Sequence, residues 1–158
     1  MDKEKQYILK EEFPLLYRIM FTREEGHPFH CIQAFGVECG NGWFELLYDL
    51  SSKLEEIIAS LPEDQQAYYH VVQVKEKFGG LRFYLSAETD EMEDYISEAE
   101  NMSYHVCEEC GEPGECNTEG WLTTLCDKCR DERELGRSID SIEDVFDWVD
   151  EDTEEEDG

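Results

Sequence analysis

Apolar residues recur at three- and four-residue steps in two stretches of the chain. Residues 43–61 carry one stripe, which predicts an amphipathic helix with Asn41 as its N-cap and Pro62 just beyond its end. Residues 89–104 carry a second stripe, and the hydroxyl of Thr89 is expected to cap that helix. Acidic residues fill the turn that follows, where they interact favourably with the helix dipole. The inner faces of the two helices comprise Trp43, Leu46, Leu47, Leu50, Leu54, Ile57, Ile58 and Leu61, and then Met92, Tyr95, Ile96, Ala99 and Met102.

Residues 70–86, between these helices, have the composition and alternation of a β-hairpin. Gly79 and Gly80 are expected to form its two-residue turn, because glycine tolerates positive φ. Near the N-terminus, Pro14 separates a short helix from a second short helix or turn, and both are expected to pack over the core. The side chains expected to face the core from the hairpin are Val72, Val74 and Phe78 in the first arm and Leu81, Phe83 and Leu85 in the second.

Two Cys-x-x-Cys pairs follow the second helix, and the fifteen residues between them fit a four-cysteine zinc site. The pairs are Cys107 with Cys110 and Cys126 with Cys129. Gly111 suits a left-handed turn after the first pair, and residues 121–125 have the composition of a strand leading into the second. Redox dithiols are the alternative. Four thiolates would close the metal shell, so we expect structural rather than catalytic zinc, with Cys116 as a spare thiol.

These patterns predict an α+β fold. A small antiparallel, hairpin-centred sheet packs on helices and is followed by a four-cysteine zinc ribbon and an acidic tail. We expect three regions: an α+β core over residues 1–87, a helix plus zinc ribbon over 88–137, and an acidic, partly disordered tail over 138–158.

A second group of metal-ligating residue types lies around Pro28. It consists of His27, His30, Cys31 and Cys39. Imidazole and thiolate are good zinc ligands, so these residues could form a second metal site. Their spacing matches no common finger or ribbon pattern, and the alternative is a surface loop with buried cysteines.

Charge changes this picture, because 41 acidic residues against 13 basic ones give a net charge of −28. Such a chain repels nucleic acid and anionic membranes, and it suits a protein partner with a basic, nucleic-acid-binding surface. From Phe83 to Asp127 there are thirteen acids and no lysine or arginine. Paired metal-type cysteines and the absence of a signal peptide or an apolar membrane-spanning run favour a soluble protein in a reducing, cytoplasmic compartment.

The partner-binding residues expected from this charge pattern lie on the second helix and in the tail. They are Glu91, Asp94, Glu98, Phe146 and Trp148. Aromatic residues within an acidic segment suit partner docking, whereas a plain solubilising tail is the alternative.

Two sequence elements add a resemblance. They are Gly-Val-Glu-Cys-Gly-Asn-Gly-Trp-Phe at 36–44 and Gln-Val-Lys-Glu-Lys-Phe-Gly-Gly-Leu-Arg-Phe-Tyr at 73–84. With the cysteine pairs, the chain resembles small uncharacterised proteins of tailed phages and prophages over roughly residues 30–130. The resemblance implies a phage context, with host-cell cytoplasm as the compartment. It implies no catalytic residue.

No constellation of an enzyme is visible. The chain lacks a phosphate-binding Gly-x-x-x-x-Gly-Lys, a His-Glu-x-x-His and a nucleophile elbow. His105 is followed by Val106 rather than by the x-Glu of a zinc deaminase. We therefore expect no enzymatic activity.

The function we expect is protein–protein interaction by an acidic zinc-binding protein. By mimicking DNA, it would inhibit a host nucleic-acid-handling or defence protein, such as a restriction, CRISPR or other nuclease, or a polymerase. The alternative is a zinc-ribbon protein associated with nucleic acid or with transcription regulation, although the chain has few of the clustered basic residues that nucleic-acid binding requires. A plainer version keeps protein binding and leaves the acids as a source of solubility.

Overall fold

The computed structural model describes residues 1–23 and 29–136. The chain divides into one unit over Met1–Cys126 and a second over Asp127–Gly158, of which residues 127–136 are described and are helical. The elements of the first unit are α1 (Lys3–Glu12), α2 (Cys31–Phe35), β1 (Val37–Glu38), a 3₁₀ turn (Asn41–Trp43), α3 (Phe44–Ser60), α4 (Glu63–Gln66), β2 (Val71–Lys77), β3 (Gly80–Leu85), α5 (Asp90–Ser103), β4 (Glu115–Cys116) and β5 (Thr124–Leu125).

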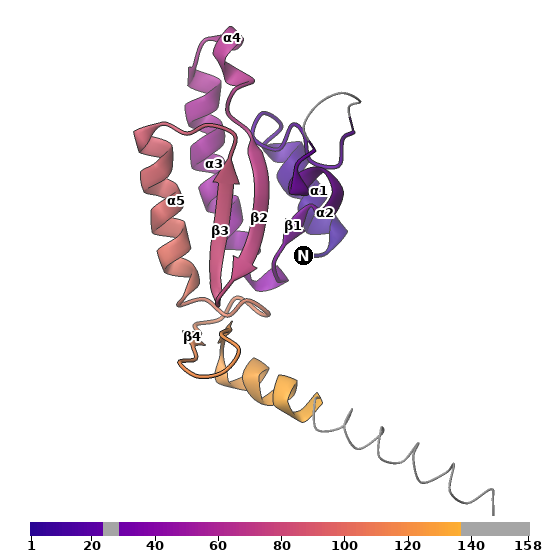
Figure 1. The fold of residues 1–158 in the computed structure, drawn as a ribbon, viewed down its shortest axis with the longest axis vertical. Coiled ribbons are helices and arrows are strands. Elements are labelled where there is room, and N and C mark those ends of the chain that lie inside the picture. Colours follow the sequence, from indigo (N-terminus) through magenta and orange to yellow (C-terminus); the bar gives the residue numbers. More distant parts are fainter. Residues whose placement is uncertain (24–28, 137–158) are drawn as a thin grey trace, which may run out of the picture. The chain divides into compact units, whose positions relative to one another are not determined.

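A three-stranded sheet with the order β1-β2-β3 forms the centre of the first unit (Figure 1). The β2–β3 hairpin is antiparallel, as predicted, and β1 pairs in parallel with β2. The helices α3 and α5 pack against each other, and α5 also packs against β3. The predicted α+β fold is therefore confirmed. The two-residue β1 strand was not predicted, because it is too short to show an alternating pattern.

The hairpin turn lies one residue earlier than predicted. Lys77 pairs with Gly80, so the turn consists of Phe78 and Gly79, with φ of 54° and 83°. Gly80 instead begins β3, where an added Cβ would lie 2.4 Å from the ring of Tyr104. The prediction that Phe78 faces the core is wrong, because its side chain is 64% exposed.

The first arm of the hairpin also differs in its register. An irregularity between Val71 and Gln73 turns Val71 inward, and Val71 and Val74 are both fully buried. Val72, which was expected to face the core, is only half-buried. A bulge shifts the alternation by one residue, and the amino-acid pattern alone does not reveal it.

The helix predicted over residues 43–61 forms, with its buried face as expected. The N-terminal end of the helix differs from the prediction, because a 3₁₀ turn precedes α3 and Asn41 does not cap it. The side-chain oxygen of Asn41 instead accepts a hydrogen bond from the backbone amide of Asp2 at 2.9 Å. Trp43 is fully buried at the junction between the turn and α3.

The second predicted helix is α5, and the hydroxyl of Thr89 accepts the cap bond from the Met92 amide. Met92, Ile96 and Ala99 face the core, whereas Met102 is 49% exposed. The break at Pro14 is also found, and the segment after it is held by Glu55, whose carboxylate accepts bonds from the Leu15 and Leu16 amides. Within residues 1–23 and 29–136, no helix is both long and apolar enough to cross a membrane.

Candidate metal centre

The four predicted cysteines come together. The sulfur atoms of Cys107, Cys110, Cys126 and Cys129 all lie within 4.8 Å of one another. The Sγ atoms of Cys110 and Cys126 are 3.7 Å apart. Four thiolates at about 2.3 Å from a tetrahedral metal ion have sulfur atoms about 3.8 Å apart. The group therefore fits one ion with a closed, four-sulfur shell, and this confirms the predicted metal site.

The first pair lies on a tight turn that is held by backbone hydrogen bonds. The Gly111 amide donates to the Cys107 carbonyl at 2.9 Å, and Gly111 has φ of 83°. The left-handed residue predicted there is confirmed. The Cys107 amide donates to the Glu112 carbonyl, and the Glu108 amide donates to the Thr124 carbonyl. We call residues 106–126 the metal module.

The second pair lies where a strand ends and a helix begins. β4 and β5 are antiparallel, Cys126 follows β5 directly, and Cys129 lies in the first turn of the helix 127–136. The predicted strand over 121–125 is limited to Thr124–Leu125. Trp121 lies in the loop before it and is 78% exposed. A short strand, β5, therefore leads into the second pair as predicted, and a helix follows it.

Two cysteines of the first unit differ in acidity, and geometry explains the difference. Burial raises the pKa of Cys107, but hydrogen bonds from the backbone amides of Cys126, Cys110 and Glu109 outweigh it and lower the pKa to about 7. Burial in the core, with the Glu108 carboxylate adding to it, raises the pKa of Cys39 to about 12. Cys107 is thus prepared to be a thiolate ligand, whereas Cys39 is an inert core thiol.

The glycine-rich element around residues 40–43 holds the metal module against the core. The Gly42 amide donates to the Glu108 carbonyl at 2.7 Å, and the Gly40 amide donates to the Glu108 carboxylate at 2.9 Å. The indole Nε1 of Trp43 donates to the Val106 carbonyl at 2.8 Å. A Cβ on Gly42 would lie 2.1 Å from the Cys107 carbonyl oxygen, so only glycine allows this approach.

The hairpin tip makes the second attachment. The Thr124 hydroxyl donates to the Gly79 carbonyl at 2.6 Å, and a Cβ on Gly79 would lie 2.7 Å from the Cys116 sulfur. Both sequence elements that carry the phage resemblance therefore contact the metal module. In the sequence, these elements indicated only a resemblance. The glycines beside Trp43 and Phe78 were the signal that could have indicated close packing.

The second predicted metal cluster is not assembled by the residues that the structure describes. Among these, the Cys107 group is the only set of three or more potential ligands whose atoms converge. Cys39 is buried in the core, and His30 instead packs beside His70, with ring centroids 6.5 Å apart. Cys31 begins α2, and His27 lies outside the described residues.

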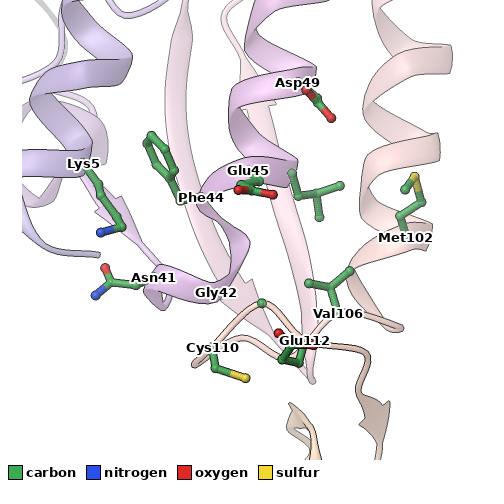
Figure 2. Close-up of a pocket in the computed structure, with 12 residues that line it drawn as sticks. Lys5, Asn41, Gly42, Phe44, Glu45, Asp49, Met102, Val106, Cys110 and Glu112 are labelled. Carbon is green, nitrogen blue, oxygen red and sulfur yellow. The ribbon is translucent and has the colours of Figure 1, made fainter.

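A pocket of about 480 Å³ lies beside the first cysteine pair (Figure 2). Its charged lining is Lys5 from α1, Glu45 and Asp49 from α3, and Glu112 from the metal module. Apolar side chains line it as well, namely Phe44, Leu46, Met102 and Val106, so the pocket is mixed in character and selects no one class of ligand.

The residues predicted to bind a partner lie only in part within the described residues. Glu91, Asp94 and Glu98 are exposed on α5. Phe146 and Trp148 lie outside the described residues. Cys116 lies in β4, apart from the four-sulfur group.

Comparison with protein-family models, with curated proteins and with solved structures finds no match for the chain. The fold and metal site together define a small α+β protein with a four-cysteine metal centre. The resemblance to phage proteins stays a prediction.

Proposed function

We propose that this chain is a zinc-stabilised interaction module whose acidic face binds a basic, nucleic-acid-binding surface of another protein and excludes nucleic acid from it. One observation supports this above others, namely a surface of exposed carboxylates on two packed helices. This acidic face consists of Glu91, Asp94 and Glu98 on α5 and of Asp49 and Glu56 on α3.

Two pockets lie between α3 and α5. Glu56 and Glu91 line one of them, Asp49 and Glu98 line the other, and Lys53 and Tyr95 line both. Lys53 lies between them, with its ammonium group 5.2 Å from the centre of the Tyr95 ring. Within the described residues, no salt bridge joins Glu91, Asp94 or Glu98 to a basic side chain. These three carboxylates are thus available to an external cation.

The spacing of these charges suits a surface that normally binds nucleic acid. A helix rises about 1.5 Å per residue, so the steps from Glu91 to Asp94 and from Asp94 to Glu98 cover roughly 4.5 and 6 Å. Duplex DNA carries one charge per roughly 3.4 Å along each strand. The three carboxylates of α5 therefore approach the charge spacing of one nucleic-acid strand, and Asp49 and Glu56 add two charges seven residues apart on α3. A basic groove would attract them by the same long-range field.

Zinc is the metal that we propose for the four-sulfur site. Thiolates select Zn²⁺ among the common divalent ions of cells, and a four-coordinate shell with no open position is typical of structural zinc. The metal would hold the turn of Cys107 and the start of the helix 127–136 together. We assign it no catalytic role.

The class of partner follows from the charge. A nuclease, a restriction or CRISPR effector, or a polymerase has a deep basic channel, and a phage protein that fills such a channel would inhibit it. Binding of this kind has a high association rate that falls steeply as salt rises.

The experiment that tests the proposal is affinity capture from a bacterial lysate with the intact chain, followed by elution with a salt series or with duplex DNA. The key variant is the triple substitution Glu91→Gln, Asp94→Asn and Glu98→Gln. We expect captured nucleic-acid-binding proteins to elute with salt and with DNA, and their recovery to fall at least tenfold with the variant.

A matched control neutralises three exposed acids elsewhere, Glu11→Gln, Glu63→Gln and Asp64→Asn. It changes the net charge by the same amount and should retain capture. An equal loss of capture in both variants would show that capture depends on net charge and not on the acidic face. A partner that resists salt, ignores DNA and binds the α5 variant normally would refute mimicry.

A further inference from the structure

An apolar groove of about 470 Å³ lies between the tip of the β2–β3 hairpin and the loop before β5. It is lined by Glu76, Lys77, Phe78, Gly120, Trp121 and Leu122. Phe78 is 64% exposed and Trp121 is 78% exposed. Two large aromatic side chains thus stand on facing loops, on a part of the first unit that the acidic face does not include.

The hairpin places Phe78 where local structure does not favour it. A turn with positive φ at both central residues prefers asparagine followed by glycine, and an aromatic residue at φ of 54° is strained. Strain of this kind persists where the surrounding structure enforces it, and it concentrates at binding sites. Burial does not account for Phe78, because most of its side chain is in solvent.

The opposite wall is held rigid by hydrogen bonds. The Asn117 amide donates to the carbonyls of Glu119 and Trp121 at 2.7 and 2.9 Å, and its oxygen accepts from the Thr123 amide at 2.7 Å. The bond from Thr124 to Gly79 ties this loop to the hairpin. The two aromatic side chains are therefore carried by an ordered frame, and a preorganised aromatic anchor is what a binding hot spot requires.

Charge identifies the occupant. Lys77 already lies over the Phe78 ring, 5.5 Å from its centre. The Trp121 wall belongs to the base-free stretch, and the carboxylate that lines the groove is that of Glu76, which also accepts a hydrogen bond from the Gly79 amide at 2.8 Å. An indole face is the best aromatic partner for a cation, and the Glu76 carboxylate in the groove adds to the attraction. The complement is a cationic side chain over the indole with an apolar side chain beside it.

We propose that the groove binds a protein segment in which an arginine or lysine stacks on Trp121 while a neighbouring aliphatic or aromatic side chain enters between Trp121 and Phe78. The inference rests on the proposed function in one respect, that the partner is basic. It uses a different surface, so it predicts a second contact that persists when the acidic face is neutralised.

The test uses the full zinc-loaded chain, labelled with ¹⁵N, and three synthetic peptides. The first is acetylated and amidated Gly-Arg-Leu-Arg-Leu-Gly. The second replaces arginine by glutamate, and the third replaces leucine by glycine. We expect the first peptide to shift the amide signals of residues 76–79 and 119–123 and to bind at least tenfold more tightly than either of the others.

Two variants and a control make the result decisive. Trp121→Ala should weaken binding at least tenfold. Phe78→Asn should weaken binding while it leaves thermal stability unchanged or higher, because asparagine suits the turn. Tyr68→Ala, which removes another highly exposed aromatic side chain, should bind normally.

Binding that is unchanged in Trp121→Ala, or equal for the arginine and glutamate peptides, would overturn the inference. Shifts confined to α5 would also overturn it and would leave the proposed function standing. Failure of mimicry alone would also be visible. Peptide binding to the groove would survive neutralisation of Glu91, Asp94 and Glu98, while lysate capture by that variant would match capture by its control.

Discussion

The sheet-and-helix core and the metal module are stabilised in different ways. Most buried apolar side chains of the described residues belong to the core, among them Trp43, Leu54 and Leu81. In residues 106–126 only Cys107 and Leu125 are buried in this way, and one of them is a metal ligand. Apolar burial supplies the main driving force for folding, so the module depends on its metal and on contacts with the core.

Removing the metal should have the largest effect on this comparison. Structural zinc contributes about 10–16 kcal/mol in small zinc-binding peptides, and the module has little else to replace it. We expect Cys126→Ser, or chelation of the wild type, to abolish hydrogen-exchange protection in residues 106–126 first, while α3 and β2–β3 retain theirs. Mass spectrometry of the native protein should show one zinc per chain.

The control for metal removal is Cys116→Ser, which changes a thiol outside the four-sulfur group and should retain the zinc. An unaltered circular dichroism spectrum and unaltered thermal stability after complete chelation would show that the module folds without metal, and the contrast between the two regions would disappear.

A cavity in the core should have the next largest effect. Leu54→Ala removes a fully buried side chain of α3, and such truncations cost about 2–5 kcal/mol. Urea unfolding measures the loss, with the exposed Ser52→Ala as a neutral control. Zinc content should be unchanged at low denaturant. A cost below about 1 kcal/mol would mean that the core around α3 relaxes to fill the space.

A substitution at the junction should weaken both regions together. Gly42→Ala forces its Cβ toward the Cys107 carbonyl, and overpacking of this kind costs about 1–3 kcal/mol. We expect lower stability and a faster loss of zinc to a chelator. Gly136→Ala is the matched control, because among the described residues no atom outside its chain neighbours and its own helix backbone lies within 4 Å of the added Cβ. Normal zinc retention in Gly42→Ala would show that the two regions are independent.

The smallest expected effect is a change in folding stability with pH, and it involves the core alone. Burial lowers the pKa of His70, and the nearby Arg18 and His30 add to this, whereas a hydrogen bond with the Ala67 carbonyl opposes it. Below about pH 6.5 the unfolded chain binds this proton more readily, so stability is present above that pH and is lost as the pH falls through the folded pKa. The loss should stay under about 1.4 kcal/mol, because His70 is only half-buried.

His70→Gln isolates this contribution from the titration of the many carboxylates. The difference in unfolding free energy between wild type and variant should shift against the wild type between pH 7.5 and pH 5.5. A constant difference across that range would show that His70 does not couple to folding.

The contrast between the regions also explains what the sequence could predict. The metal ligands were predictable because two close pairs of thiols are a local pattern, and α3 and α5 were predictable from periodicity. The position of the turn at Phe78 was not, because Gly80 is required by Tyr104, which lies far along the chain. The exposed Trp121 was read as part of a strand, because only the side-chain bonds of Asn117 show that residues 117–123 form a loop.

The bond from Trp43 to Val106 has a consequence for how the chain is made on the ribosome. The two residues are 63 positions apart, and the related bond from Gly40 to Glu108 spans 68. At roughly 5–20 residues per second, the indole waits about 3–13 s for its acceptor to be synthesised. Nascent α3 can therefore form early, but the contacts at its N-terminal end are completed only after the first cysteine pair is synthesised. Metal binding is thus a late step in translation.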